Sequence, residues 1–186
     1  MAGGVHVDAR QIQIEAQQNL DELGVVSPWP DCSGEASNLP VEYVHSALLS
    51  RLNDWIKSGR EPPASRLLSL VHDASGQEVI ETDTDGNPVG GVRLPQLAVP
   101  TGVWTGNSQS LWCILNGSFI PFSAAELARR YPDRADYLRQ TFAAIVKAHR
   151  QGFLQRRNAV EIFADAYYSD IGVNDVHRRS AQTGER

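Results

Sequence analysis

The chain has 186 residues and a net charge of −5, and 41% of its residues are hydrophobic. This length suits one domain with a short tail. The acidic balance argues against a nucleic-acid-binding protein, which would carry a basic stripe. No apolar run approaches the roughly 20 residues of a membrane helix. The start of the chain shows no signal segment, so a cytoplasmic location is expected if Met1 is the natural start. Cys32 and Cys113 are expected to be unpaired thiols.

The first part of the chain combines a loop with helices. Residues 2–8 are typical of a strand end that runs into a functional loop, and a short helix is expected over 15–23. A longer helix is predicted over 39–58, because apolar residues recur there at the spacing of one helical face. That face consists of Val41, Val44, Leu48, Leu52, Trp55 and Ile56. Asn38 is expected to cap this helix and Gly59 to end it.

The helix over 39–58 is expected to dock on a core through Leu48, Leu52 and Trp55. If a partner segment is missing, the same three side chains form an exposed apolar face and a route to self-association.

The middle of the chain predicts a small, mostly antiparallel sheet. Extended segments over 78–82 and 89–94 flank a turn at Asp85-Gly86, which predicts a hairpin. Residues 64–77 are expected to be irregular. The pair Gly90-Gly91 indicates a bulge or a close approach of two backbones. Two further apolar runs of strand length are Leu97–Val99 and Leu111–Leu115.

Three helices are predicted toward the C-terminus. Ser123 and Glu126 have the spacing of a capping box, as do Asn158 and Glu161. Asp133 is expected to cap a helix over 134–150. The apolar face of this helix is predicted to consist of Leu138, Phe142, Ile145 and Val146.

The sequence offers no metal or cofactor pattern. The five histidines include no H-x-x-x-H or H-E-x-x-H pair, and no C-x-x-C occurs. Asp83, Asp85 and Asn87 alternate as in a calcium loop, but the glycine stands at the wrong offset and no glutamate closes the loop. Neither metal nor cofactor is therefore expected.

Serine hydrolysis needs a nucleophile on a tight strand-to-helix turn, a histidine base and an acid. No G-x-S-x-G occurs, and the nearest sequence surrounds Ser108, where the last glycine is replaced by serine. We interpret this stretch as a polar loop between two short strands. The alternative is an autonomous hydrolase that uses Ser108 with His6, His149 or His177.

Three other residues are candidates for a site. His6 suits either a surface histidine or a general base on a loop after a strand. Trp104 and Trp112 flank the Ser108 loop and suit either the core or the wall of a substrate groove.

Several motifs resemble, in order over residues 2–172, the C-terminal portion of bacterial α/β-hydrolase domain-containing proteins. The segment Ala2–Asp8 is similar to A-G-x-x-H-x-D, which carries the catalytic histidine of that family. Trp55–Gly59 with Pro62-Pro63 is similar to W-V-x-x-G-x-x-P-P, and Gly90–Pro95 to G-G-I-R-x-P. The resemblance implies a hydrolase of esters or similar acyl bonds in which His6 is the general base.

The resemblance also implies an organisation. In α/β-hydrolases the nucleophile precedes the histidine, so the serine, the acid and most of the parallel sheet are expected upstream of residue 1. The expected fold class is α+β, mainly helical with a small, mostly antiparallel sheet. The expected segments are the end of the hydrolase core (1–59), a loop-rich β segment (60–122), C-terminal helices (123–173) and a disordered tail (174–186).

This organisation implies a chain that is inactive alone. Its expected partners are the preceding hydrolase core and a small ester substrate. The alternative function is a non-catalytic module that binds a ligand or a protein.

Overall fold

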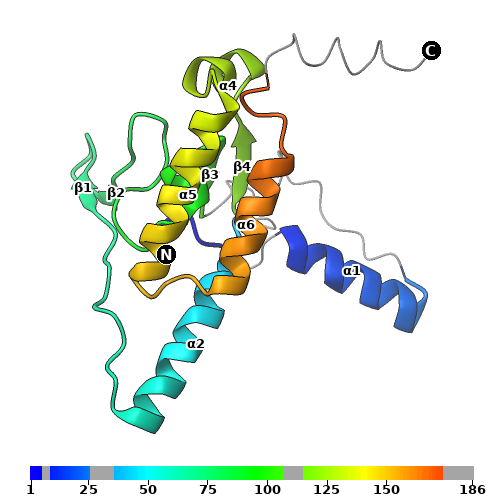
Figure 1. Cartoon of the computed structure of the whole chain (residues 1–186), viewed down its shortest axis with the longest axis vertical. Coiled ribbons are helices and arrows are strands. Elements are labelled where there is room, and N and C mark those ends of the chain that lie inside the picture. The colour runs from blue at the N-terminus through cyan, green and yellow to red at the C-terminus, as the bar shows by residue number, and fades with distance from the viewer. Residues whose placement is uncertain (6–8, 26–35, 107–114, 174–186) are drawn as a thin grey trace.

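The computed structural model describes residues 1–5, 9–25, 36–106 and 115–173, and these residues form a mainly helical α+β fold (Figure 1). The expected fold class is confirmed. The helices are α1 (Ala9–Leu23), α2 (Val41–Ser58), α3 (Pro95–Ala98), α4 (Ala124–Arg130), α5 (Arg134–Arg150) and α6 (Arg156–Tyr168). The strands are β1 (Leu70–His72), β2 (Glu78–Ile80), β3 (Gly102–Thr105) and β4 (Ser118–Pro121), paired antiparallel as β1–β2 and β3–β4.

Helix α2 follows the predicted bounds, but Asn38 does not cap it. Pro40 stands at the N-cap position, and the Asn38 side chain accepts a hydrogen bond from the indole of Trp104 instead. Gly59 ends the helix as predicted. It adopts φ 71°, and its N–H donates to the carbonyl of Trp55.

The prediction that α2 docks through Leu48, Leu52 and Trp55 is wrong. These side chains are 41%, 45% and 48% exposed, while the buried residues of α2 are Val41, Tyr43, Val44 and Ala47. Only the first turns of α2 lie against the body, and the second half projects below the other helices in Figure 1. The helical period identified the apolar stripe, but it did not show where along the helix the contact ends.

The β segment pairs differently from the sequence prediction. Strand β2 pairs with β1, so residues 70–72 are extended and not irregular. The turn at Asp85-Gly86 does form, but an isolated bridge between Thr82 and Pro88 replaces the expected hairpin strands. The Asp83 carboxylate accepts the N–H groups of Asp85 and Asn87, which makes the turn locally self-sufficient.

Leu97 lies in a short helix and not in a strand. Pro95 occupies the first turn of α3, where its missing N–H costs nothing, and Leu97 is fully buried. The close approach predicted at Gly90-Gly91 is confirmed. A Cβ at Gly90 would lie 2.7 Å from the Leu67 carbonyl oxygen.

The C-terminal helices follow the predicted caps with one exception. Ser123 accepts the Glu126 N–H at the start of α4, and Asp133 accepts the Ala135 N–H at the start of α5. Asn158 does not cap a helix, because α6 begins earlier, at Arg156, and takes Asn158 into its buried side.

The apolar face of α5 is rotated from its predicted position. Ile145 is buried as predicted, whereas Phe142 is 57% exposed. Tyr137 and Thr141 occupy the buried side instead.

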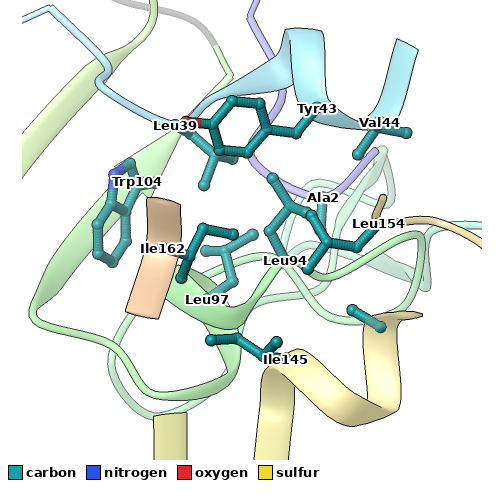
Figure 2. Close-up of a cluster of buried hydrophobic side chains, with 11 residues drawn as sticks. Ala2, Leu39, Tyr43, Val44, Leu94, Leu97, Trp104, Ile145, Leu154 and Ile162 are labelled. Atoms are coloured by element: carbon teal, nitrogen blue, oxygen red, sulfur yellow. The ribbon is translucent and has the colours of Figure 1, made fainter. Parts of the chain in front are cut away.

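One hydrophobic cluster joins the first residues of the chain to α2, α3, β3, α5 and α6 (Figure 2). It gathers Ala2, Leu39, Tyr43, Val44, Leu94, Leu97, Trp104, Ile145, Ala148, Leu154 and Ile162. A second cluster, formed by Val99, Tyr131, Tyr137 and Ala166, joins α3 to the C-terminal helices. Ala2 therefore shares a core with residues of α6. No described helix is long and apolar enough to cross a membrane.

Candidate functional site

Most of the residues proposed from the sequence as catalytic or substrate-binding lie outside the described residues. His6, Ser108, Trp112 and His177 belong to this group. Trp104 lies in β3, and His149 lies in the last turn of α5, where its Nδ1 is 2.8 Å from the Leu154 carbonyl oxygen. The structure therefore defines the surroundings of the candidate site through the residues that flank it.

The segment that contains His6 is held at both ends. On one side, the Ala2 N–H donates to the Val92 carbonyl at 3.1 Å. On the other side, the Ala9 N–H donates to the Ser37 carbonyl at 2.9 Å. Ser37 is itself fully buried, and its N–H donates to the Asn116 carbonyl at 3.2 Å. Both flanks of residues 6–8 are therefore tied to the β3–β4 region and to the strand-like stretch before α3.

The flank of the His6 segment also lies against the flank of the Ser108 segment. A Cβ at Gly106 would lie 2.7 Å from the Gly4 carbonyl oxygen. A Cβ at Gly117, which adopts φ 58°, would collide with the Val5 side chain and the Thr105 carbonyl. Side chains at Gly106 and Gly117 would therefore separate these two stretches of chain.

Trp104 is a core residue that supports this junction. It is 2% exposed, its ring stacks 4.6 Å from that of Phe119, and its Cβ lies 3.4 Å from the position of a Cβ on Gly3. Its indole N–H donates to Asn38 Oδ1 at 2.8 Å. Its backbone N–H donates to Asn87 Oδ1 at 2.9 Å. Both N–H groups of this aromatic residue thus have hydrogen-bond partners in the interior.

Trp104 also lines a pocket of about 250 Å³ between α3, α5 and α6. The polar residues of its wall include Asn38, Gln96, Thr141 and Asp165. A neighbouring pocket of about 230 Å³ shares Asn38, Gln96 and Asp165 with it. The second pocket adds Arg10, Pro40, Glu42 and Tyr43. Together these walls present amide, hydroxyl and carboxylate groups beside the indole of Trp104.

Two tyrosines near these pockets are held in the neutral form. Burial raises the pKa of Tyr43, and its hydroxyl donates to a Glu161 carboxylate oxygen at 2.6 Å, which raises the pKa further. Burial also raises the pKa of Tyr137. The Thr141 hydroxyl makes no well-formed hydrogen bond, although it lies close enough to the Tyr137 hydroxyl to offset part of that increase. Both phenols are therefore hydrogen-bond donors at neutral pH and not bases.

Charged side chains hold the turn at Asp85-Gly86 against the neighbouring helices. Arg130 pairs with Asp85 through both oxygens, pairs with Glu126, and lies 4.4 Å over the Phe122 ring. Arg93 pairs with Asp83 at 3.0 Å and also donates to the Leu97 carbonyl. These contacts fix the turn at Asp85-Gly86 against α3 and α4. Among the described residues, no group of three or more His, Cys, Asp or Glu side chains forms a metal site.

The sequence interpretation missed the residues that build this neighbourhood. The sequence predicts Asn38 as a helix cap, and it presents Asn87 as part of a calcium-like pattern and of the family's G-N segment at Gly86-Asn87. Gln96 and Asp165 carried no signal in a single sequence, because each is an ordinary polar residue of a helix. Only the fold brings Asn38, Gln96 and Asp165 to one wall.

A family model described as "Alpha/beta hydrolase domain" matches residues 1–164. Comparison with the curated proteins and with the solved structures gives no significant match to this chain. The matched range includes His6, Trp104 and most of the region described above, and it ends within α6, one residue before Asp165.

Proposed function

This chain belongs to the alpha/beta hydrolase domain family, and on that premise we propose that it supplies the catalytic histidine of a serine hydrolase that cleaves ester or similar acyl bonds. His6 is the general base in this proposal. It takes the proton from the nucleophilic serine and returns it to the leaving group. The serine and the acid come from a segment that precedes these residues in the family order, because the chain contains no G-x-S-x-G.

One structural observation carries the proposal. The described residues on either side of residues 6–8 are hydrogen-bonded to other parts of the fold, through Ala2 on one side and Ala9 on the other. A general base needs such support, because a displacement of about 1 Å from the reacting hydroxyl can cost roughly a hundredfold in rate. In this proposal the segments 1–59, 60–122 and 123–173 have different roles in the site. The first carries His6, and the second and third form the walls that contain Trp104, Gln96 and Asp165.

In the mechanism, the Trp104 pocket receives the part of the substrate that does not react. Trp104, which is 2% exposed, lines this pocket, and Asn38, Gln96 and Asp165 offer hydrogen-bonding groups around it. We propose Trp104 as a substrate-binding residue on this ground, and Trp112 as its counterpart on the other side of the Ser108 segment. Because Trp104 is also a core residue, Trp104→Phe is the informative variant. It should raise KM more than it lowers kcat, whereas an unchanged KM would remove Trp104 from this role.

The test uses a fluorophosphonate probe, which bonds to a serine activated by a base and an oxyanion hole. The purified chain should not be labelled. When the chain is joined to the preceding portion of a longer family member, labelling should appear and should disappear in His6→Ala. His149→Ala is the matched control and should label normally. Labelling that survives His6→Ala would contradict the proposal.

A second candidate is an autonomous hydrolase in which Ser108 is the nucleophile. It is favoured by the contact between Gly4 and Gly106, which brings the flanks of the His6 and Ser108 segments together. In this case the purified chain is labelled by itself, and Ser108→Ala abolishes the labelling. The same experiment therefore separates the two candidates.

The alternative of a non-catalytic binding module is tested by the joined chain. It predicts that neither the chain alone nor the joined protein is labelled. It also predicts a stable, monodisperse chain without any added segment.

A further inference from the structure

The second half of α2 is an apolar helix end without a partner in the described chain. Its apolar side chains lie along one broad face of the helix and remain 41–76% exposed. They are Leu48, Leu49, Leu52, Trp55 and Ile56. In Figure 1 this half of α2 lies apart from the other helices. A few turns of helix are marginal in water unless a face is packed, so this helix end is suited to an interaction surface.

The same chain carries an apolar groove on another face. A pocket of about 370 Å³ lies between α5 and α6, and its wall is almost entirely apolar. The wall includes Phe142, Ile145, Ala159, Val160, Phe163, Tyr167 and Tyr168. Phe142, Val160 and Tyr168 are 57%, 63% and 81% exposed. We call this surface the α5–α6 groove.

The helix end cannot reach the groove of its own chain. The first half of α2 is fixed beside α6, because Tyr43 donates to Glu161 and Gln155 donates to the Ser46 carbonyl. From this anchor the helix runs away from the body (Figure 1). A straight helix held in this way presents its distal side chains to another molecule.

We propose that two copies of this chain associate reciprocally, with the α2 end of each copy in the α5–α6 groove of the other. An apolar helix laid into an apolar groove is a common mode of protein recognition. Leu52 and Trp55 lie one turn apart on the helix and are the anchors for the groove. Closed, two-fold pairing satisfies both surfaces on both copies and leaves none open for further growth.

The area is sufficient for a stable pair. The exposed fractions leave roughly 500 Å² of apolar surface on the helix end and a similar area along the groove. A reciprocal pair contains two such contacts, so complete coverage would bury up to roughly 2,000 Å², and about 60% coverage would reach the roughly 1,200 Å² at which stable interfaces begin. This inference concerns assembly and does not depend on the proposed catalysis.

Sedimentation velocity of the purified chain over a wide concentration range tests the proposal. A concentration-dependent dimer is expected. Leu52→Lys and Val160→Glu should each weaken association at least about tenfold, since each places a charge in the apolar contact. Leu67→Lys is the matched control. Leu67 is 83% exposed and lies outside both surfaces, so this variant should dimerise normally.

A mixture of the two variants gives the sharpest result. In a mixed pair, Lys at position 52 of one copy meets Glu at position 160 of the other, while the second contact is unchanged. The mixture should therefore dimerise where each variant alone does not. A monomeric wild-type chain, open-ended assemblies, or a dimer insensitive to Val160→Glu would overturn the proposal. Circular dichroism should show that all variants keep their helical content.

Discussion

The side-chain amide of Asn87 stands beside Trp104 in place of a neighbouring strand. Asn87 is fully buried, its Nδ2 donates to the Gly102 carbonyl at 3.1 Å, and its Oδ1 accepts the Trp104 N–H at 2.9 Å. Strand β3 has β4 on one edge, and Asn87 supplies its other edge with a matched donor and acceptor. The support for the Trp104 region therefore depends on one residue of a turn.

Asn87→Leu should lower the free energy of unfolding by about 2–3 kcal/mol. The variant leaves the Trp104 N–H and the Gly102 carbonyl without partners in the interior, and each buried unsatisfied group costs roughly 1–3 kcal/mol. Urea denaturation measures the loss. Asn53→Ala, an exposed change on α2, should stay within about 0.5 kcal/mol of wild type. Equal stabilities of these two variants would contradict the structural role of Asn87.

Gly90→Ala should destabilise the chain by roughly 3 kcal/mol or more. Gly90 adopts φ 75°, and a Cβ there would lie 2.7 Å from both the Leu67 carbonyl oxygen and the Ser69 nitrogen. Gly76 is the matched control. It adopts φ 81° but has nothing within 4 Å of a Cβ, so Gly76→Ala reports backbone strain alone, about 1–2 kcal/mol. Similar losses in thermal unfolding for the two variants would show that crowding at Gly90 is unimportant.

Acid should destabilise the fold partly through Glu126. Hydrogen bonds from Arg129 and Arg130 lower the pKa of this carboxyl in the folded chain. Its contribution is therefore complete above the unfolded pKa of about 4.3 and is lost as the pH falls through the lower folded value. Glu126→Gln should show a smaller decrease in Tm between neutral pH and the acid range than wild type. A decrease as large as that of wild type would exclude Glu126 as a source of acid sensitivity.

Alkali should destabilise the fold through Tyr131. Burial raises the pKa of Tyr131 to about 12, and its hydroxyl donates to the Pro100 carbonyl at 2.8 Å. An unfolded tyrosine ionises near pH 10. The stability linked to this phenol is therefore intact below about pH 10 and is lost as the pH rises toward 12. Phenolate absorbance should show one late-titrating group fewer in Tyr131→Phe than in wild type, because Tyr43 and Tyr137 also titrate late. Complete titration of wild type near pH 10 would contradict this environment.

The sequence predicted local structure better than contacts between distant segments. The ends of α2 and α5 followed from Gly59 and Asp133, because caps depend only on neighbouring atoms. The close approach at Gly90 also followed from the residue type. The pairing of β1 with β2 did not, since a short hairpin with exposed faces has no alternation of apolar and polar residues to reveal its register.

The candidate site was predictable only in part. The alpha/beta hydrolase family followed from the order of motifs around His6, and the family match confirms the family. The pocket beside Trp104 was not predictable, because it depends on Asn38, Gln96 and Asp165 from three separate helical or pre-helical segments. Asn158 shows the opposite error. Its spacing to Glu161 predicted a helix cap, but Asn158 lies inside α6, on the buried side of the helix.

The shared core of Ala2, Leu154 and Ile162 has a consequence during synthesis. Within this chain Ala2 is translated before every other member of the core, whereas Leu154 and Ile162 follow more than 150 positions later. Early segments such as α2 therefore leave the ribosome before α6 is available to pack against them. Tyr43 and Val44 of α2 stay uncovered until α6 has been translated. The yield of the chain in a cell should depend on chaperones that shield the first half while the second is translated.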